Sequence, residues 1–410
     1  MKIAIIGGGA AGFFAAIRCA EINPACKITI FERGRDVLEK VRISGGGRCN
    51  LTHACPDPRE LIKNYPRGSR EMLGPFTRFG ALDTVEWFKK RGVATKTEAD
   101  GRMFPVSNSS ETIVECLTIA AKKAGVKIRL NARVEHFSPK NPGWELKIGG
   151  EERPVFFEKI MVAAGSSPAV WQVLEKLGHR IVAPVPSLFT FNIKDARLAE
   201  IPGVAVPKVS VFFREKKIAT ASPILVTHWG LSGPAILKLS AIGARDFHSV
   251  KYHFPIEINW LFDKNLIETG NLLSDAKLNF SKKSILANPQ FGLPARLWQK
   301  LATAAGISEG LRWADLDKKT AQLFAGQLCA ARFEVGGKST FKEEFVTAGG
   351  VDLREVDFKK FESRRCPGLF FAGEILDIDA VTGGFNFQAA WTGGWLAGTA
   401  MAGHPENWHQ

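Results

Sequence analysis

The stretch that decides the fold is KIAIIGGGAAGFFAAIRCAEINPACKITIFE, residues 2–32. It predicts an apolar strand over 2–6, a glycine turn over 7–12, an apolar helix from about 11 to 21 and a second strand over 26–32. A unit of about thirty residues in this order has the size of a right-handed βαβ crossover in a parallel sheet. The sequence therefore predicts an α/β fold built on a Rossmann-type sheet.

The glycines of this stretch follow the spacing G-x-G-x-x-G, and an acid closes the next strand. Gly7 permits the tight turn, Gly9 lets the backbone approach a pyrophosphate, Gly12 allows close helix packing, and Glu32 can accept a hydrogen bond from a ribose hydroxyl. The pattern predicts a bound adenine dinucleotide, the alternative being a glycine turn that serves packing alone. The motif does not separate FAD from NAD, and no second such motif follows a strand.

Composition describes a globular chain with several domains. At 410 residues, two or three domains are expected, and 45% hydrophobic with 23% charged residues can form sizeable cores. No apolar run reaches the roughly 20 residues of a membrane helix, so no membrane association is expected. The start imitates a signal peptide, but its glycines interrupt the apolar core. Seven scattered cysteines favour reduced thiols, and we expect a cytoplasmic protein.

The formal net charge is +14, with an isoelectric point near 9.5. Such a balance attracts polyanions such as RNA, although it is also compatible with a role in solubility alone. No basic tail concentrates the charge. The sequence does not predict the oligomeric state.

Periodicity divides the remaining chain. A helix is predicted at about 108–124, and strands follow at 126–130 and 132–137. The prolines in APVPSLFTF predict an exit from the domain near 184–190. Short strands then predict a small barrel or sandwich up to about 260, and a helical pattern follows over 263–328.

The stretch PGLFFAGEILDIDAVTGGFNFQAAWTGGWLAG, residues 367–398, carries a second ligand signal. An apolar strand ends in Gly373 with acids beyond it, and a Thr-Gly-Gly turn precedes an apolar helix that begins near Asn386. The amino end of that helix would direct N–H groups and a positive dipole at an anion, such as the flavin edge that becomes negative on reduction. The stretch resembles the C-terminal flavin motif of two-dinucleotide-fold flavoproteins.

More narrowly, the chain resembles the BaiN-like, or aminoacetone-oxidase-like, family of FAD-dependent oxidoreductases. The resemblance covers almost the full length and rests on IIGGGAAG, SGGGRCNLTH, DGRMFPVS, THWGLSGPAIL, TAGGVDLREVD and GEILDIDAVTGGFNFQAAW. It implies a discontinuous FAD-binding Rossmann-type domain over 1–187 and 341–410. A β-barrel substrate or cap domain is expected over 188–262 and 329–340, with a helical insert domain over 263–328.

The resemblance also implies cofactor-binding residues. For the adenosine-diphosphate half these are Gly7, Gly9, Ala10, Ala11, Gly12, Glu32, Arg33 and Val134. For the second glycine loop and turn they are Ser44, Gly45, Gly46, Gly47, Arg48, Asn50, Ala164 and Gly165. For the ribityl, phosphate and isoalloxazine end they are Gly373, Glu374, Asp379, Gly383, Gly384, Phe385 and Asn386. The chain departs from the family pattern at Ala380, Phe385 and Phe387, which can reshape the pocket.

Members of the family are associated with steroid-type enones, small amino ketones and uridine of ribosomal RNA, so the fold does not fix the substrate. Reduction of an enone and of the uracil C5=C6 bond share one chemistry, in which a hydride reaches the β-carbon and an acid protonates the α-carbon. Cys49 is one candidate acid, although a packing role in a tight loop is favoured. His228 is the other, and a structural histidine bonded to backbone is equally compatible.

No metal site is expected, because Cys49, His53 and Cys55 supply three ligands in an unusual spacing without a fourth nearby. GLSGP lacks the G-x-S-x-G pattern of a hydrolase nucleophile. One hypothesis is an NAD(P)H-driven flavin reductase acting on ribosomal-RNA uridine. A second is a small-molecule oxidase or enone reductase, and a third is a non-catalytic flavin-binding protein.

Overall fold

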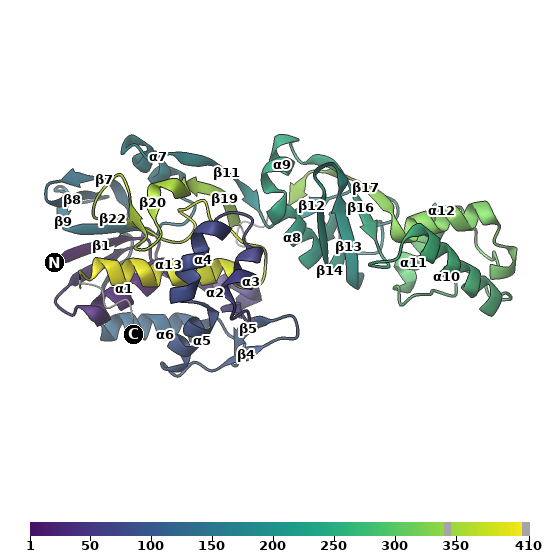
Figure 1. Cartoon of the computed structure of the whole chain (residues 1–410), viewed down its shortest axis with the longest axis horizontal. Helices are drawn as coiled ribbons and strands as arrows, with labels where there is room; N and C mark the ends of the chain where they lie inside the picture. Colours follow the sequence, from purple (N-terminus) through teal and green to yellow (C-terminus); the bar gives the residue numbers. More distant parts are fainter. Residues whose placement is uncertain (340–345, 404–410) are drawn as a thin grey trace. The chain divides into compact units, whose positions relative to one another are not determined.

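The computed structural model describes residues 1–339 and 346–403. It divides the chain into two compact units, residues 1–185 with 342–410 and residues 186–341 (Figure 1). The chain leaves the first unit inside the predicted exit at 184–190. The predicted return at 340/341 lies outside the described residues. A separate helical domain over 263–328 stays a prediction.

The first unit is built on a seven-stranded sheet whose central strands are parallel. The strand order is β20-β21-β22-β10-β1-β2-β6. Every residue of β1 after Lys2 is buried, as expected for a strand covered on both faces. The strands are β1 (Lys2–Ile6), β2 (Lys27–Phe31), β6 (Lys127–Arg129), β10 (Lys159–Val162), β20 (Val356–Asp357), β21 (Glu362–Ser363) and β22 (Leu369–Phe371).

Two apolar helices from opposite ends of the chain pack together beneath this sheet, α1 (Ala10–Ile22) and α13 (Phe385–Met401) (Figure 1). Their close approach requires glycine on α13. A Cβ on Gly394 would lie 2.6 Å from the Ala11 carbonyl oxygen, and one on Gly398 would lie 2.5 Å from that of Ala15. The first and last helices therefore form one layer, as the predicted discontinuous domain requires.

Smaller elements complete the first unit. The two strands on either side of Glu158 belong to different sheets: β9 pairs with β8, whereas β10 joins the central sheet. No element was predicted between 54 and 107, where the structure has short helices and two strands. The remaining helices are α2 (Glu39–Gly47), α3 (Pro58–Leu61), η1 (Ile62–Asn64), α4 (Ser69–Arg78), α5 (Ala81–Lys89), α6 (Glu111–Lys123), α7 (Pro168–Lys176) and η4 (Leu353–Glu355). The remaining strands are β3 (Thr52–His53), β4 (Thr95–Thr97), β5 (Arg102–Pro105), β7 (Val134–Lys140), β8 (Gly143–Ile148), β9 (Val155–Phe157), β11 (Ile181–Ser187) and β19 (Val346–Val351).

The second unit contains an antiparallel sheet in the order β17-β16-β13-β14-β15-β12-β18. The first and last strands of this order follow each other in the chain, joined by Gly337, whose carbonyl accepts from the Asn192 N–H at 3.0 Å. The sheet therefore returns on itself as a small barrel. Its strands are β12 (Thr190–Asn192), β13 (Ala205–Phe213), β14 (Ile218–Thr227), β15 (Gly230–Ser232), β16 (His253–Asn259), β17 (Ala331–Gly336) and β18 (Lys338–Ser339). Its short helices are η2 (Arg214–Lys216), α8 (Pro234–Ile242) and α9 (Ala244–Ser249).

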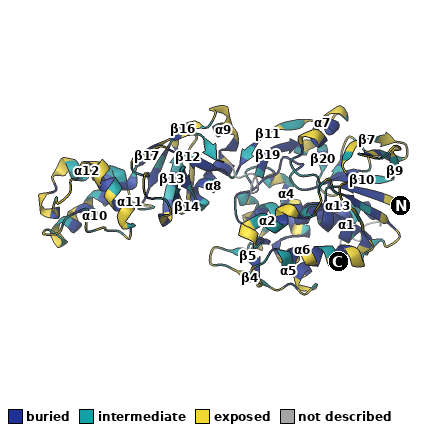
Figure 2. Cartoon of the chain, turned by 180° about the vertical axis from the view of Figure 1, so that it is seen from behind, coloured by how far each residue is buried: buried dark blue, intermediate teal, exposed yellow. Residues whose placement is uncertain are grey.

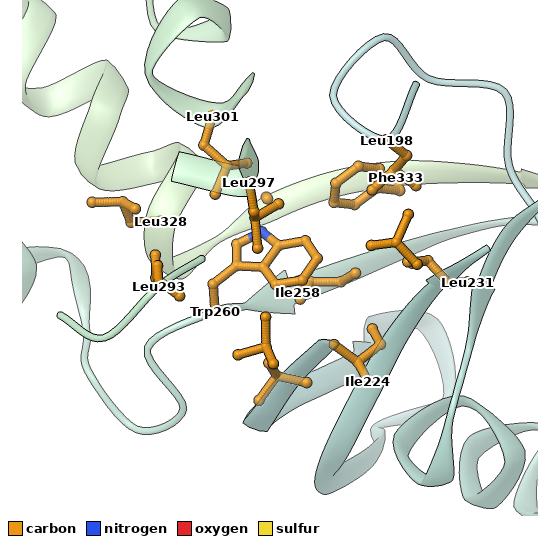
Figure 3. Packing of buried hydrophobic residues seen from close by; sticks show 14 of the residues in the cluster. Leu198, Ile224, Leu231, Ile258, Trp260, Leu293, Leu297, Leu301, Leu328 and Phe333 are labelled. Atoms are coloured by element: carbon orange, nitrogen blue, oxygen red, sulfur yellow. The ribbon is translucent and has the colours of Figure 1, made fainter. Parts of the chain in front are cut away.

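A helical segment is inserted between β16 and β17 of this barrel. It comprises α10 (Leu266–Asn279), α11 (Ala295–Ala304), η3 (Trp313–Asp315) and α12 (Lys318–Cys329). Figure 3 shows Trp260 between barrel residues such as Ile258 and Phe333 and residues such as Leu297 and Leu328 of the helical segment. The barrel and the helical segment thus share one continuous hydrophobic core.

Among the helices that the structure describes, none is both long enough and apolar enough to cross a membrane.

Candidate cofactor site and functional residues

The first glycine turn leaves open space in front of a helix. A Cβ on Gly7, at φ +113°, would lie 2.4 Å from the Ala163 carbonyl oxygen, and one on Gly12 would lie 2.2 Å from that of Gly7. A Cβ on Gly9 would meet no atom of the described residues within 4 Å. Gly9 is the N-cap of α1, whose first turn, including Ala10 and Ala11, contains no acid. The free N–H groups of this turn can therefore donate hydrogen bonds to a pyrophosphate.

Glu32 is held at the end of β2 by backbone groups. Its Oε2 accepts from the Gly8 N–H and its Oε1 from the Gly34 N–H, both at 2.8 Å. Each carboxylate oxygen has two lone pairs, so both can still accept from ribose hydroxyls. The carboxylate is thereby oriented before any ligand arrives.

A cavity of about 470 Å³, which includes the space open to solvent, lies beside this carboxylate. It brings together five of the predicted residues, Gly7, Glu32, Arg33, Val134 and Ala164. The sequence reasoning missed its other lining residues, Ile6, Phe31, Ala132, Arg133, Ser167, Ala169 and Val170. Ser167 ends the AAGSS turn of residues 163–167, and Ala169 and Val170 follow it closely, so this turn is the signal that could have identified them. The cavity, the carboxylate and the open turn fit the adenosine-diphosphate half of a dinucleotide.

The second glycine loop interrupts α2. Ser44 is extended, and Gly45, Gly46 and Gly47 have φ of +58°, +67° and +79°. This left-handed run is accessible to glycine at little cost. A Cβ on Gly46 or Gly47 would meet no atom of the described chain within 4 Å, so this backbone borders open space.

Polar and ring contacts attach this loop to the start of α13. Asn50, with its amide oriented to satisfy both partners, accepts from the Gly384 N–H at 2.9 Å and donates to the Thr52 carbonyl at 3.1 Å. The His53 Nδ1 lies 3.1 Å from the Gly383 carbonyl oxygen, and its ring lies 4.6 Å from that of Phe385. The structure thus brings together two predicted groups, 44–50 and 383–386. His53, considered in the sequence only as a metal ligand, belongs to this junction.

The amino end of α13 is fixed from several sides. Its N-cap is Gly384 at φ +90°, and its first turn carries no acid. The Asn386 side chain accepts from the Ala380 N–H at 2.9 Å and donates to the Ala380 carbonyl at 3.1 Å. The Tyr65 hydroxyl donates to the Phe385 carbonyl at 2.5 Å. Tyr65 lies in NYPRG, which the sequence analysis did not single out. The fixed helix end can stabilise a negative charge placed before it.

Gly165 and Glu374 meet between these two regions. A Cβ on Gly165, at φ +60°, would lie 3.7 Å from the Glu374 Oε2, and Gly373 immediately precedes this acid. The Glu374 carboxylate pairs with Lys40 of α2. These contacts bring together three predicted residues and add Lys40, a residue that the sequence reasoning missed.

Asp379 differs from the expected contact with the cofactor. Its side chain is fully enclosed, and its carboxylate forms an ion pair with Arg67 through Nε and Nη2. Buried charges require such partners. In this structure the Asp379 side chain stabilises the loop before α13 rather than facing open space.

Arg48 anchors the second glycine loop. Its guanidinium pairs with Glu98 at 2.7 Å and lies 4.1 Å from the centre of the Phe104 ring. Phe104 belongs to DGRMFPVS, one of the motifs that carry the resemblance. Arg48 thus connects this motif to the loop.

The two candidate acids lie in different units and differ in exposure. Cys49 is completely buried, and burial raises the pKa of its thiol to about 12, with an interaction with Ser44 opposing part of the rise. Because its thiol has no exposed surface, Cys49 fits the role of a packing residue better than that of a proton donor. His228 is exposed in the turn between β14 and β15 of the second unit.

Within the described residues no group of three or more His, Cys, Asp or Glu side chains is placed to hold a metal ion.

Comparison with known proteins places the chain among flavoenzymes. The family model described as HI0933-like protein Rossmann domain matches residues 1–400. The ribosomal RNA dihydrouridine synthase of Escherichia coli K12 is 30% identical over 95% of both chains. The 3-dehydro-bile acid Δ(4,6)-reductase of Clostridium scindens is 27% identical over 98% of this chain and all of the relative. A solved structure, 3-ketosteroid-Δ4-(5α)-dehydrogenase of Rhodococcus jostii RHA1, shares the fold with a TM-score of 0.53 and 16% identity, covering 98% of this chain and 96% of that one.

Proposed function

This chain belongs to the HI0933-like Rossmann-domain family, and we propose that it reduces a C=C bond conjugated to a carbonyl, with uridine of ribosomal RNA as substrate and NAD(P)H as electron donor. The family and the cofactor site establish the broader class, an FAD-dependent oxidoreductase. The observation that carries the finer proposal is the 30% identity to the E. coli ribosomal RNA dihydrouridine synthase over 95% of each chain. The net charge of +14 suits a polyanionic substrate.

In this proposal two groups of residues in the first unit hold FAD. The turn from Gly7 to Gly12, Glu32 and the adjoining cavity hold the adenosine-diphosphate half. The loop 44–50 and the amino end of α13 receive the flavin half, where N–H groups and the helix dipole stabilise negative charge. When bound, FAD supplies the two electrons of the reduction as a hydride.

The protein must supply the accompanying proton. Overall, NAD(P)H is oxidised to NAD(P)⁺, and the uracil C5=C6 bond gains one hydride at C6 and one proton at C5. The enclosed thiol of Cys49 offers no surface from which to deliver that proton. His228 is exposed, and we propose it as the candidate donor that mutation must test.

Two alanine variants test this assignment. His228→Ala should lower dihydrouridine formation at least 100-fold, the usual contribution of a positioned acid, while NADPH still bleaches the flavin at the wild-type rate. Cys49→Ala, the matched control, should retain turnover within a few-fold. Wild-type turnover in His228→Ala would remove His228 from the reaction.

The proposed activity itself is tested with purified protein. Anaerobic addition of NADPH should bleach the bound flavin, and unmodified ribosomal RNA should restore its colour while one uridine gains two hydrogens, read by mass spectrometry. Bleaching without any change in RNA mass would contradict the RNA substrate.

A second candidate function follows from the relative in Clostridium scindens. The 27% identity over the whole length of a bile acid reductase favours a small steroid-like enone as substrate. In that case the enone, and not RNA, would reoxidise the reduced flavin. Rapid peroxide formation with amines would instead indicate an oxidase.

A further inference from the structure

The helical segment of the second unit has one end at the barrel and one end away from it. Helix α10 follows β16 and α12 leads into β17, and these two strands pair with each other. The Trp260 N–H donates to the Leu328 carbonyl at 2.9 Å, which fixes the barrel end of α12. Helix α10 has 14 residues and extends about 21 Å. The carboxyl end of α10 and the amino end of α12 therefore lie at the end of the helical segment that is away from the sheet (Figure 1).

At this distal end two backbone segments run side by side. The Trp313 N–H donates to the Lys283 carbonyl and the Ala314 N–H to the Ser281 carbonyl, both at 3.0 Å. The Lys277 Nζ donates to the Leu316 carbonyl at 2.7 Å. These bonds gather six basic residues, which we name the distal basic cluster: Lys277, Lys282, Lys283, Arg312, Lys318 and Lys319.

The cluster is exposed and lacks acidic partners. All its members except the half-buried Lys277 are exposed, and Figure 2 shows exposed residues along α10 and α12. None of the six forms an ion pair with a carboxylate within 1–339 and 346–403, whereas Lys264 pairs with Glu268 and Lys300 with Glu200 nearer the barrel. Surface cations without partners are available to an external anion.

The two acids within the same segments do not neutralise the cluster. Asp317 caps α12, accepting from the Thr320 N–H at 2.9 Å and from the Thr320 hydroxyl at 2.6 Å. Residues 277–283 and 311–319 therefore carry six cations against two carboxylates, Asp315 and the capping Asp317. The local balance stays strongly positive.

The position of two lysines opposes helix stability. Lys318 and Lys319 open α12, at the helix end where the dipole disfavours cations, and the first turn contains no acid. Asp317 at the N-cap is the one acid at this helix end, and the two lysines that follow it oppose the helix dipole. The arrangement therefore points to a bound anion as the reason for these lysines.

We propose that the distal basic cluster binds the phosphate backbone of the RNA substrate, an inference that rests on the proposed function. Lysines spread over α12 and the neighbouring loop can contact successive phosphates without reading bases. This surface would position RNA, and the chemistry would be performed elsewhere.

The test removes four of these charges. The variant K282Q/K283Q/K318Q/K319Q should bind a labelled, unmodified ribosomal RNA hairpin at least tenfold more weakly. Its plot of log affinity against log salt should be less steep by about one for each lysine that contacts a phosphate. The matched control K89Q/K90Q/K122Q/K123Q removes the same charge from exposed ends of α5 and α6 in the first unit and should bind as the wild type does.

Three readouts separate the outcomes. Both variants should retain wild-type FAD content and NADPH bleaching, since no substituted residue lies in the cofactor site. Unchanged affinity and salt slope in the quadruple variant, or equal weakening in the control, would overturn the inference. Binding that depends on the cluster without any reduction of uridine by the wild type would instead refute the proposed function and leave the surface intact.

Discussion

At the scale of single residues, Glu32 shows how the backbone prepares a binding group. Both carboxylate oxygens accept backbone N–H bonds, so the ribose receives an oriented acceptor without further ordering. In Glu32→Gln an amide NH₂ must face one of these N–H donors, and a donor left without its acceptor costs about 1–3 kcal/mol. We expect FAD to dissociate about 10- to 100-fold more readily, measured by titrating the apoprotein.

Glu115→Gln is the control for this variant, since Glu115 is exposed on α6 and does not line the cavity beside Glu32. It should leave FAD affinity unchanged. Wild-type affinity in Glu32→Gln would show that this carboxylate does not hold the ribose.

At the scale of elements, the two glycines Gly12 and Gly9 of the strand–turn–helix unit have different roles: Gly12 is needed for packing, and Gly9 leaves room for the ligand. A Cβ on Gly9 meets open space at φ −91°, whereas a Cβ on Gly12 would lie 2.2 Å from the Gly7 carbonyl oxygen. Gly9→Ala should therefore fold with a melting temperature of the apoprotein close to the wild type but lose FAD, because its methyl group occupies the space of the pyrophosphate. Gly12→Ala should lower the melting temperature itself.

Both variants are compared by thermal unfolding of the apoproteins and by FAD titration. Retention of full FAD affinity in Gly9→Ala would contradict the assignment of this turn to the cofactor.

A buried histidine in the segment between α7 and β11 makes the stability of the first unit depend on pH. The buried His179 Nδ1 lies 3.0 Å from Glu355 Oε2, and its Nε2 lies 3.2 Å from the Ser363 Oγ. Burial lowers the pKa of His179 below its ordinary value of 6.5, an effect that Glu355 opposes in part. Below about pH 6.5 the unfolded chain therefore binds a proton that the folded chain binds less readily, and stability is lost as pH falls.

Denaturant unfolding between about pH 7.5 and 5.5 measures this loss. His179→Gln should show a smaller loss than the wild type over that range, whereas the same change at the exposed His136 should leave the loss unchanged. Equal losses in His179→Gln and the wild type would exclude His179 as the source.

At the scale of the whole molecule, periodicity and glycine spacing predicted those elements whose residues lie close together in the sequence. Residues 2–32 predicted strand, turn, helix and acid because periodicity and glycine spacing act within one unit. The family resemblance joined the two ends of the chain in one domain, and α1 packs on α13 as that domain requires. The barrel and the helical segment followed from alternating and helical periodicity.

Neither periodicity nor residue spacing predicts contacts between residues that are distant in the sequence. Asn50 bonds to Gly384 and Arg67 pairs with Asp379 across more than 300 positions of sequence, and their charges or amides alone do not specify these partners. The enclosure of Cys49 depends on neighbours from several elements in the same way. Between 54 and 107, short elements of three to ten residues leave too few periods to read.

Mass spectrometry of ribosomal RNA from a strain lacking the gene tests the proposal that this flavoenzyme reduces uridine in ribosomal RNA. We expect dihydrouridine to disappear from one position, to return when the wild-type gene is restored, and to stay absent with the Gly9→Ala gene. An unchanged dihydrouridine level in the deletion strain would contradict the account.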